Sequence, residues 1–188
     1  TMKSCIEKKT EITKGGAVYN STSFSLIGIG TFIDSLYAIK KTVFEDRKYT
    51  LEHLKEMIKA DFQGFEADRQ YLMNKLPKYG QPDAGVDKLA KQVFHDLAKH
   101  SSGMPNPRGG YYEASLFAFF FYDVVKENTW ATPDGRHAGQ RISRGCNPGE
   151  TSENIDAATL MNSLRSIDMA EYPGCGVTYL EMPVSQTD

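Results

Sequence analysis

Apolar residues recur at intervals of three and four along much of the chain, the spacing that gathers side chains on one face of an α-helix. We predict helices at 32–43, from an N-cap at Thr50 through residue 58, at 64–76 and at 156–167, with residues 3–12 as the tail of another. The clearest pattern is formed by Val86, Leu89, Ala90, Val93, Phe94 and Leu97. The chain is therefore predicted to be rich in helix.

The run 116–122 has a different hydrophobic pattern, because its apolar residues follow one another without alternation. Such a run predicts a strand buried on both faces, as in a parallel sheet or barrel. A second strand is predicted at 177–182. Two strands do not make a stable sheet, so the pattern indicates that partner strands come from outside this sequence.

Glycine, proline and small polar residues mark the connections at 17–30, 77–85 and 101–110. The polar stretch 126–154 is predicted to be a long loop. Long loops in compact domains are usually functional or covered by other structure. The segment 131–136, Ala-Thr-Pro-Asp-Gly-Arg, predicts a tight turn in which Arg136 anchors a carboxylate or a carbonyl.

Composition excludes several classes of function. The 188 residues carry a net charge of −2 without long Lys or Arg runs, so we expect neither nucleic acid nor a membrane surface as partner. No apolar stretch approaches the roughly 20 residues of a membrane span. Cys5, Cys146 and Cys175 have no regular spacing. This favours free thiols and a cytoplasmic location over a disulfide scaffold.

Candidate sites of common chemistry are weak. The four histidines have no helical i, i+4 pair and no Cys-x-x-Cys occurs, so no metal site is predicted. Gly28-x-Gly30 lacks the third glycine and the preceding strand of a dinucleotide fingerprint, which favours close packing as the use of these glycines. Cys146 lies near Arg141 and Arg144, and positive neighbours lower the pKa of a thiol. No acid–base partner is visible nearby in the sequence, so an incidental loop cysteine is favoured over a reactive one.

Several blocks occur together in an order that resembles the glycyl radical enzyme family, the pyruvate formate-lyase and dehydratase type. The resemblance runs over essentially the whole chain. The blocks are Gly15-Gly16-Ala17-x-Tyr19-Asn20, Gly28-Ile29-Gly30-Thr31, Asp34-Ser35-Leu36-x-Ala38-Ile39-Lys40-Lys41, Pro77-Lys78-Tyr79-Gly80, Asn106-Pro107-Arg108-Gly109-Gly110 and Thr132-Pro133-Asp134-Gly135-Arg136.

The resemblance implies an α/β fold, part of a ten-stranded α/β barrel, with residues 1–188 as one segment from the second half-barrel and its outer helices. Residues 117–125 are then expected to be a barrel strand. Phe119, Phe121 and Val125 are one choice for a wall of the substrate pocket, and Phe120 and Tyr122 are the other. The motif residues with an expected structural role are Gly28, Gly30, Asp34, Lys40, Thr132, Asp134, Gly135 and Arg136.

The family's chemistry, as the resemblance implies it, needs a cysteine in a Gly-Cys-Val-Glu-like loop and a glycine in a C-terminal Arg-Val-x-Gly-Tyr-like loop. This chain has neither. The segment Ser4-Cys5-Ile6-Glu7 is similar to the first, but the Gly-Gly-Ala block places it downstream of that loop, at the end of a helix. We therefore assign no catalytic residue and no cofactor to this segment.

The parent protein is expected to be an anaerobic radical lyase or dehydratase, and this chain alone is expected to be inactive. Its implied cofactor is a glycyl radical installed by a radical-SAM activase. The implied partners are the remainder of the polypeptide, the activase, a small organic substrate and a second subunit of a homodimer.

Three segments depart from the family pattern, at 80–83, 155–159 and 174–177. The departures at 80–83 and 155–159 leave room for the alternative of a free-standing, truncated relative that acts as a binding or structural module.

Overall fold

The computed structural model describes residues 2–150 and 156–180. Helices dominate this part of the chain, as the periodicity predicts. In chain order the main elements are α1 (Lys3–Lys8), β1 (Thr22–Ser25), α2 (Ile29–Ile39), α3 (Leu51–Lys59), α4 (Glu66–Asn74), α5 (Ala84–Ser101), β2 (Tyr112–Leu116), α6 (Phe121–Val124), α7 (Ala157–Leu164) and β3 (Cys175–Gly176). Single turns are η1 (Ile12–Lys14), η2 (Lys40–Glu45, π-helical), η3 (Lys126–Asn128) and η4 (Met169–Glu171).

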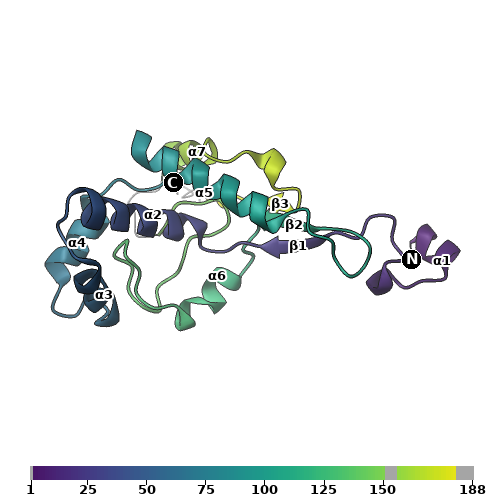
Figure 1. Ribbon diagram of the computed structural model, residues 1–188, viewed down its shortest axis with the longest axis horizontal. Coiled ribbons are helices and arrows are strands. Elements are labelled where there is room, and N and C mark those ends of the chain that lie inside the picture. Colours follow the sequence, from purple (N-terminus) through teal and green to yellow (C-terminus); the bar gives the residue numbers. More distant parts are fainter. Residues whose placement is uncertain (1, 151–155, 181–188) are drawn as a thin grey trace, which may run out of the picture.

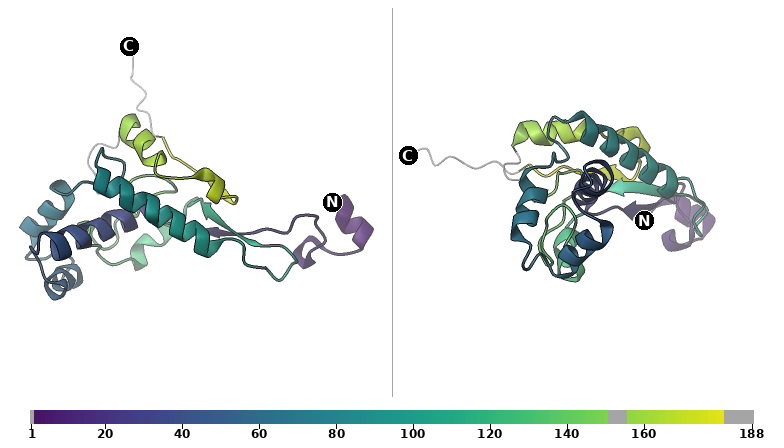
Figure 2. Two further views of the ribbon diagram at one scale, coloured as in Figure 1. Left: turned by 45° about the horizontal axis from the view of Figure 1, so that its top comes forward. Right: turned by 60° about the vertical axis from the view of Figure 1, so that its left-hand side comes forward.

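The molecule is elongated, with α1 at one end and α3 and α4 at the other (Figure 1). Helix α5 lies along α2, and α6 lies on the other side of α2 (Figures 1 and 2). No residue of α1 is buried, and the helix is joined to the body by an extended segment. The core therefore lies in the rest of the molecule, away from α1.

Capping residues set the helix starts that the sequence predicts. The Thr50 hydroxyl accepts a hydrogen bond from the His53 amide at 3.1 Å, which confirms Thr50 as the N-cap of α3. The Asp83 carboxylate accepts from the Gly85 and Val86 amides at the start of α5. Each cap satisfies amide groups that have no partner within the first turn.

The strands form a parallel sheet in the order β1-β2-β3. Thr22 pairs with Tyr112, and Leu116 pairs with Gly176. β1 lies inside the predicted loop 17–30, because its sequence Thr-Ser-Phe-Ser has no apolar alternation to reveal it. The predicted strand at 177–182 is wrong for its described residues: β3 ends at Gly176, residues 177–180 form no strand, and residues 181–182 lie outside the described ranges.

The predicted strand at 116–122 is wrong, and so is the barrel strand at 117–125. β2 ends at Leu116, and Phe119 adopts a left-handed φ of 45°, which turns the chain into α6. The Phe rings stack on one another instead of packing under a second layer, with centroid distances of 5.7 Å for Phe117–Phe119 and 4.8 Å for Phe120–Phe121. An apolar run alone does not say whether the chain stays extended.

Two apolar clusters form the core. The larger one joins α2, α5 and β2 around buried side chains that include Ile33, Val86, Phe94 and Leu116. The second lies between α3 and α4, and Leu54, Met57 and Leu72 belong to it. The 131–140 turn begins at Ala131 in the second cluster, and Cys146, in the loop that follows the turn, packs in the first.

Candidate functional site

Four charged side chains are buried where α2, the 77–83 loop and the 131–140 turn meet. Asp34, Lys78 and Arg136 are each 1% exposed, and Asp134 is 0% exposed. We call these four residues the polar hub. Charged groups are almost never fully buried unless other groups compensate them, so each needs an account of its partners.

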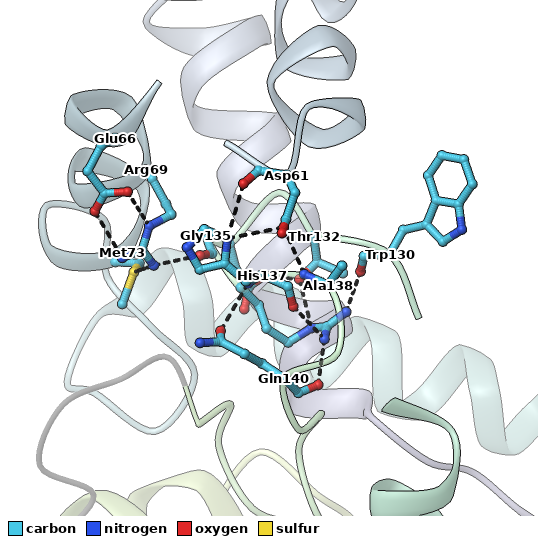
Figure 3. Close-up of polar contacts among 12 residues, drawn as sticks. Asp61, Glu66, Arg69, Met73, Trp130, Thr132, Gly135, His137, Ala138 and Gln140 are labelled. Atoms are coloured by element: carbon cyan, nitrogen blue, oxygen red, sulfur yellow. Dashed lines mark hydrogen bonds and ion pairs between the residues drawn. The ribbon is translucent and has the colours of Figure 1, made fainter. Parts of the chain in front are cut away.

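Arg136 binds the backbone of its own turn, and Figure 3 labels its partners Trp130, His137 and Gln140. Its guanidinium donates to the carbonyl oxygens of His137 at 2.9 Å and Gln140 at 2.6 Å, and also to that of Trp130. Its Nε donates to the Thr132 hydroxyl at 3.2 Å. The prediction that Arg136 anchors a carbonyl is confirmed, and burial lowers the pKa of this guanidinium while Asp134 opposes that effect.

Gly135 closes the turn. The Gly135 amide donates to the Thr132 carbonyl at 3.0 Å, and the Thr132 amide donates to the Arg136 carbonyl at 3.0 Å. Gly135 has a φ of 96°, and a Cβ there would lie 2.5 Å from Cγ of Met73 on α4. Glycine is thus required both by the backbone angle and by the close approach of α4.

Asp134 and Lys78 join the turn to the neighbouring elements. The Asp134 carboxylate accepts from the Thr132 hydroxyl and from the Ser35 hydroxyl of α2, the latter at 3.4 Å. The Lys78 ammonium donates to the carbonyls of Leu72 at 2.9 Å and Asp134 at 3.0 Å. One buried ammonium therefore links the end of α4 to the turn.

Asp34 is the hub member with the fewest partners. One of its carboxylate oxygens accepts from the Tyr79 amide at 2.7 Å, and the other has no hydrogen-bond partner among the described residues. Burial raises the pKa of this carboxyl to about 7, although Lys78 and the Tyr79 amide act against the shift.

A second layer of contacts holds the turn from outside the hub. The Asp61 carboxylate accepts from the Ala138 amide at 2.8 Å and lies 3.1 Å from His137 Nδ1 (Figure 3). Arg69 donates to the Gly135 carbonyl at 3.2 Å while also pairing with Glu66. The turn is therefore fixed by α3 and α4 as well as by its own arginine.

The remaining motif residues have separate roles. A Cβ at Gly30 would lie 2.5 Å from the Asn147 carbonyl, so the 147–149 segment covers the start of α2. The packing interpretation of Gly28 and Gly30 is thus favoured over phosphate binding at this helix end. Lys40 lies at the surface, 3.5 Å from Glu45, and takes no part in the hub.

The predicted pocket residues do not form a wall on one strand. Phe119 and Phe121 are 56% and 45% exposed, and Val125 follows α6 and is partly buried. Tyr122 lies beside Tyr179, with a ring-centroid distance of 6.3 Å. We call the exposed side chains of this region the aromatic ridge, namely Phe117, Phe119, Phe120, Phe121 and Val124.

The cysteines show no sign of activation. Burial raises the pKa of Cys146 to about 11, which opposes the lowering expected from arginines and favours the incidental reading of this thiol. Cys5 is half-buried on α1, and its sulfur would lie 2.9 Å from a Cβ at Gly16. Cys175 is exposed at a φ of 150°.

Within residues 2–150 and 156–180, no group of three or more His, Cys, Asp or Glu side chains is arranged to hold a metal ion. His95 instead pairs with Glu171 at 2.7 Å, and His137 contacts Asp61. Among the same residues no helix has both the length and the apolar character needed to cross a bilayer.

Comparison with known proteins identifies the class of protein to which these motifs belong. The family model described as pyruvate formate lyase-like matches residues 1–125. The chain belongs to this family, whose members among the relatives include glycyl radical dehydratases and lyases.

Among particular relatives, trans-4-hydroxy-L-proline dehydratase of Clostridioides difficile is 32% identical over 87% of this chain and 21% of its own length. The (2S)-3-sulfopropanediol dehydratase of Klebsiella oxytoca is also 32% identical, over 87% of this chain and 20% of its own. This chain thus spans about a fifth of the length of the curated relatives it matches.

Solved structures agree with these relatives. The substrate-bound hydroxyproline dehydratase of Clostridioides difficile superposes with a TM-score of 0.85 at 30% identity, over 93% of this chain and 22% of that one. The glycerol-bound, B12-independent glycerol dehydratase of Clostridium butyricum gives 0.83 at 31% identity, over the same shares. The fold of this segment is therefore shared with glycyl radical dehydratases.

Proposed function

We propose that this chain is one segment of the catalytic domain of a glycyl radical lyase or dehydratase that cleaves a C–C, C–O or C–N bond of a small organic substrate. The observation that carries the proposal is membership of the family over a segment about one fifth as long as the relatives. In the parent, a glycyl radical installed by a radical-SAM activase supplies the hydrogen-abstracting chemistry. No residue of this chain is assigned to that step.

The role of this segment is to shape and support the barrel that encloses the reaction. Three parallel strands are a small sheet for a catalytic domain, and parallel sheets are normally covered on both faces. The aromatic ridge next to β2 is exposed in this segment. Further strands of the parent polypeptide, completing a ten-stranded barrel, account for both features.

The segment 117–125, which includes the aromatic ridge, is the proposed contribution of this chain to the substrate cavity. Phe119, Phe121 and Val125 remain our candidates, with Phe120 and Tyr122 as the alternative. The strand alternation that first separated the two sets no longer does so, because α6 replaces the strand. Both sets therefore need to be tested in the full-length protein.

The test uses the full-length gene product, anaerobically activated by its radical-SAM enzyme and followed by electron paramagnetic resonance. We expect a glycyl radical signal, and turnover of one of three probes: trans-4-hydroxy-L-proline, glycerol or 1,2-propanediol. Residues 1–188 alone, treated identically, are expected to give neither signal nor product. A radical or turnover in the isolated segment contradicts the proposed division of labour.

The same gene decides between this proposal and the free-standing relative. The sequence on either side should encode a Gly-Cys-x-Glu loop upstream and an Arg-Val-x-Gly-Tyr loop downstream. An open reading frame without either loop overturns the enzyme proposal. The native mass of the active protein, compared with the mass of its subunit, then tests the proposed homodimer.

A further inference from the structure

The polar hub contains two carboxylates and two cations, yet its hydrogen bonds are distributed unevenly. Lys78 donates to the Leu72 and Asp134 carbonyls, and Arg136 donates to carbonyls of its own turn and to Thr132. Neither cation donates to Asp34 in the described structure. Asp34 therefore has a cation nearby without a hydrogen bond to it.

The groups that face Asp34 come from three elements. On α2 itself, the neighbouring Ser35 directs its hydroxyl to Asp134. From the 77–83 loop come the Lys78 ammonium and the Tyr79 amide, which favour the charged form of Asp34. From the turn comes the Asp134 carboxylate, which disfavours it.

Desolvation is the largest of these influences. A buried carboxylate oxygen that makes no hydrogen bond loses its hydration without compensation, whereas a protonated oxygen carries no net charge and loses less. The effect is large enough to raise the pKa of Asp34 to about 7. The oxygen of Asp34 that makes no hydrogen bond within the described ranges and the raised pKa of its carboxyl both favour the protonated form.

We propose that the polar hub is a proton-linked latch, in which Asp34 takes up a proton on folding and thereby strengthens the packing of the 131–140 turn against α2 and the 77–83 loop. The latch is closed when Asp34 is neutral and is weakened when Asp34 ionises. This inference concerns the fold of this chain and does not depend on the proposed activity.

The direction of the pH effect follows from proton binding. A folded-state pKa raised above the ordinary value of 3.8 means that the folded chain holds more protons than the unfolded chain between about 3.8 and 7. The contribution is fully present below the unfolded value and is lost as the pH rises through about 7. Stability from Asp34 therefore falls as the medium becomes alkaline.

The test compares the wild-type chain with Asp34→Asn, because asparagine is nearly isosteric and cannot ionise. Urea unfolding is followed by far-ultraviolet circular dichroism between about pH 5.5 and 8.5. Across this interval the unfolding constant of the wild type should rise by roughly 30-fold relative to that of Asp34→Asn. Every other ionisable group is present in both proteins, so its contribution cancels from this ratio.

Asp96→Asn is the matched control, since Asp96 is exposed on α5, where its carboxylate accepts from the Gln92 side chain and its backbone carbonyl lies 2.7 Å from His100 Nδ1. It should keep the wild-type pH dependence. Parallel pH profiles for the wild type and Asp34→Asn overturn the latch.

A second measurement covers the case in which Asp34→Asn does not fold. Wild-type unfolding in weakly buffered urea at about pH 5.5, read with an indicator dye, should release close to one proton from Asp34. Failure to release this proton likewise overturns the proposal.

Discussion

The polar hub and the aromatic ridge reverse the usual arrangement of residues within one small segment. In the hub, four charged side chains are almost completely buried, whereas in the ridge four phenylalanines are substantially exposed. The hub finds most of its partners inside this chain, through the carbonyls of 130–140 and of Leu72. The rings of the ridge contact one another. The hub is thus packed by residues of this chain, whereas the ridge needs a further layer to cover it.

Arg136→Ala should destabilise the polar hub more than any other substitution considered below. It removes the donors for the carbonyls of Trp130, His137 and Gln140 and leaves a cavity beside Asp134. We expect a loss of about 3 kcal/mol or more in the free energy of unfolding, measured by urea titration. The control is Arg165→Ala, at an exposed position after α7, which should change stability by no more than about 0.5 kcal/mol. Equal effects of the two substitutions would mean that the buried contacts contribute nothing.

Tyr79→Phe tests the link from the hub to the rest of the core at a smaller scale. The Tyr79 hydroxyl donates to the Ser163 carbonyl at 2.7 Å and lies 3.3 Å from the Cys146 carbonyl. Its removal should cost about 1–2 kcal/mol in the same titration, because two buried carbonyls lose a donor. Tyr19→Phe, at an 89% exposed position, should have no measurable effect. A neutral Tyr79→Phe contradicts the role given to this hydroxyl.

The double substitution Phe119→Ser and Phe120→Ser tests whether the aromatic ridge is uncovered in the isolated segment. These two rings are half exposed and contact each other and the neighbouring rings of the ridge, so stability should fall by less than about 1 kcal/mol. Self-association of the isolated segment, measured by light scattering over a concentration series, should decrease, because exposed apolar patches promote association. Tyr19→Ser removes an exposed aromatic outside the ridge and should leave association unchanged. A wild-type segment that is monomeric at every concentration argues against an uncovered ridge.

Sequence periodicity anticipates the helices because their buried stripes and caps are local. Thr50 and Asp83 cap α3 and α5 with side chains only two or three residues away from the amides they accept from. The tight turn at 131–136 and its Arg136 anchor were also predictable, since proline, aspartate and glycine encode the turn within six residues. Local chemistry of this kind needs no knowledge of the rest of the fold.

The remaining features depend on contacts between distant residues. β1 is a polar tetrapeptide that becomes a strand only because Tyr112–Leu116 pairs with it. The run 116–122 is apolar enough for a strand, but the left-handed backbone at Phe119 ends it. The burial of Lys78 is also invisible in the periodicity, because its partners lie on α4 and in the turn. The Pro-Lys-Tyr-Gly block in which it lies is the one signal that pointed to this residue.

The register of the sheet also governs how quickly this segment reaches its native state. Thr22 pairs with Tyr112, 90 positions further along the chain, and Ser115 pairs with Cys175, another 60 positions on. Such pairings demand the closure of very long loops before any ladder hydrogen bond forms, and chains with this topology fold slowly. Because the helices make local contacts, we expect them to form before the sheet. A newly synthesised chain then exposes the phenylalanines of the aromatic ridge until the strands have paired. Long-range strand pairing therefore competes with aggregation during folding. Low temperature or assistance from chaperones should favour strand pairing.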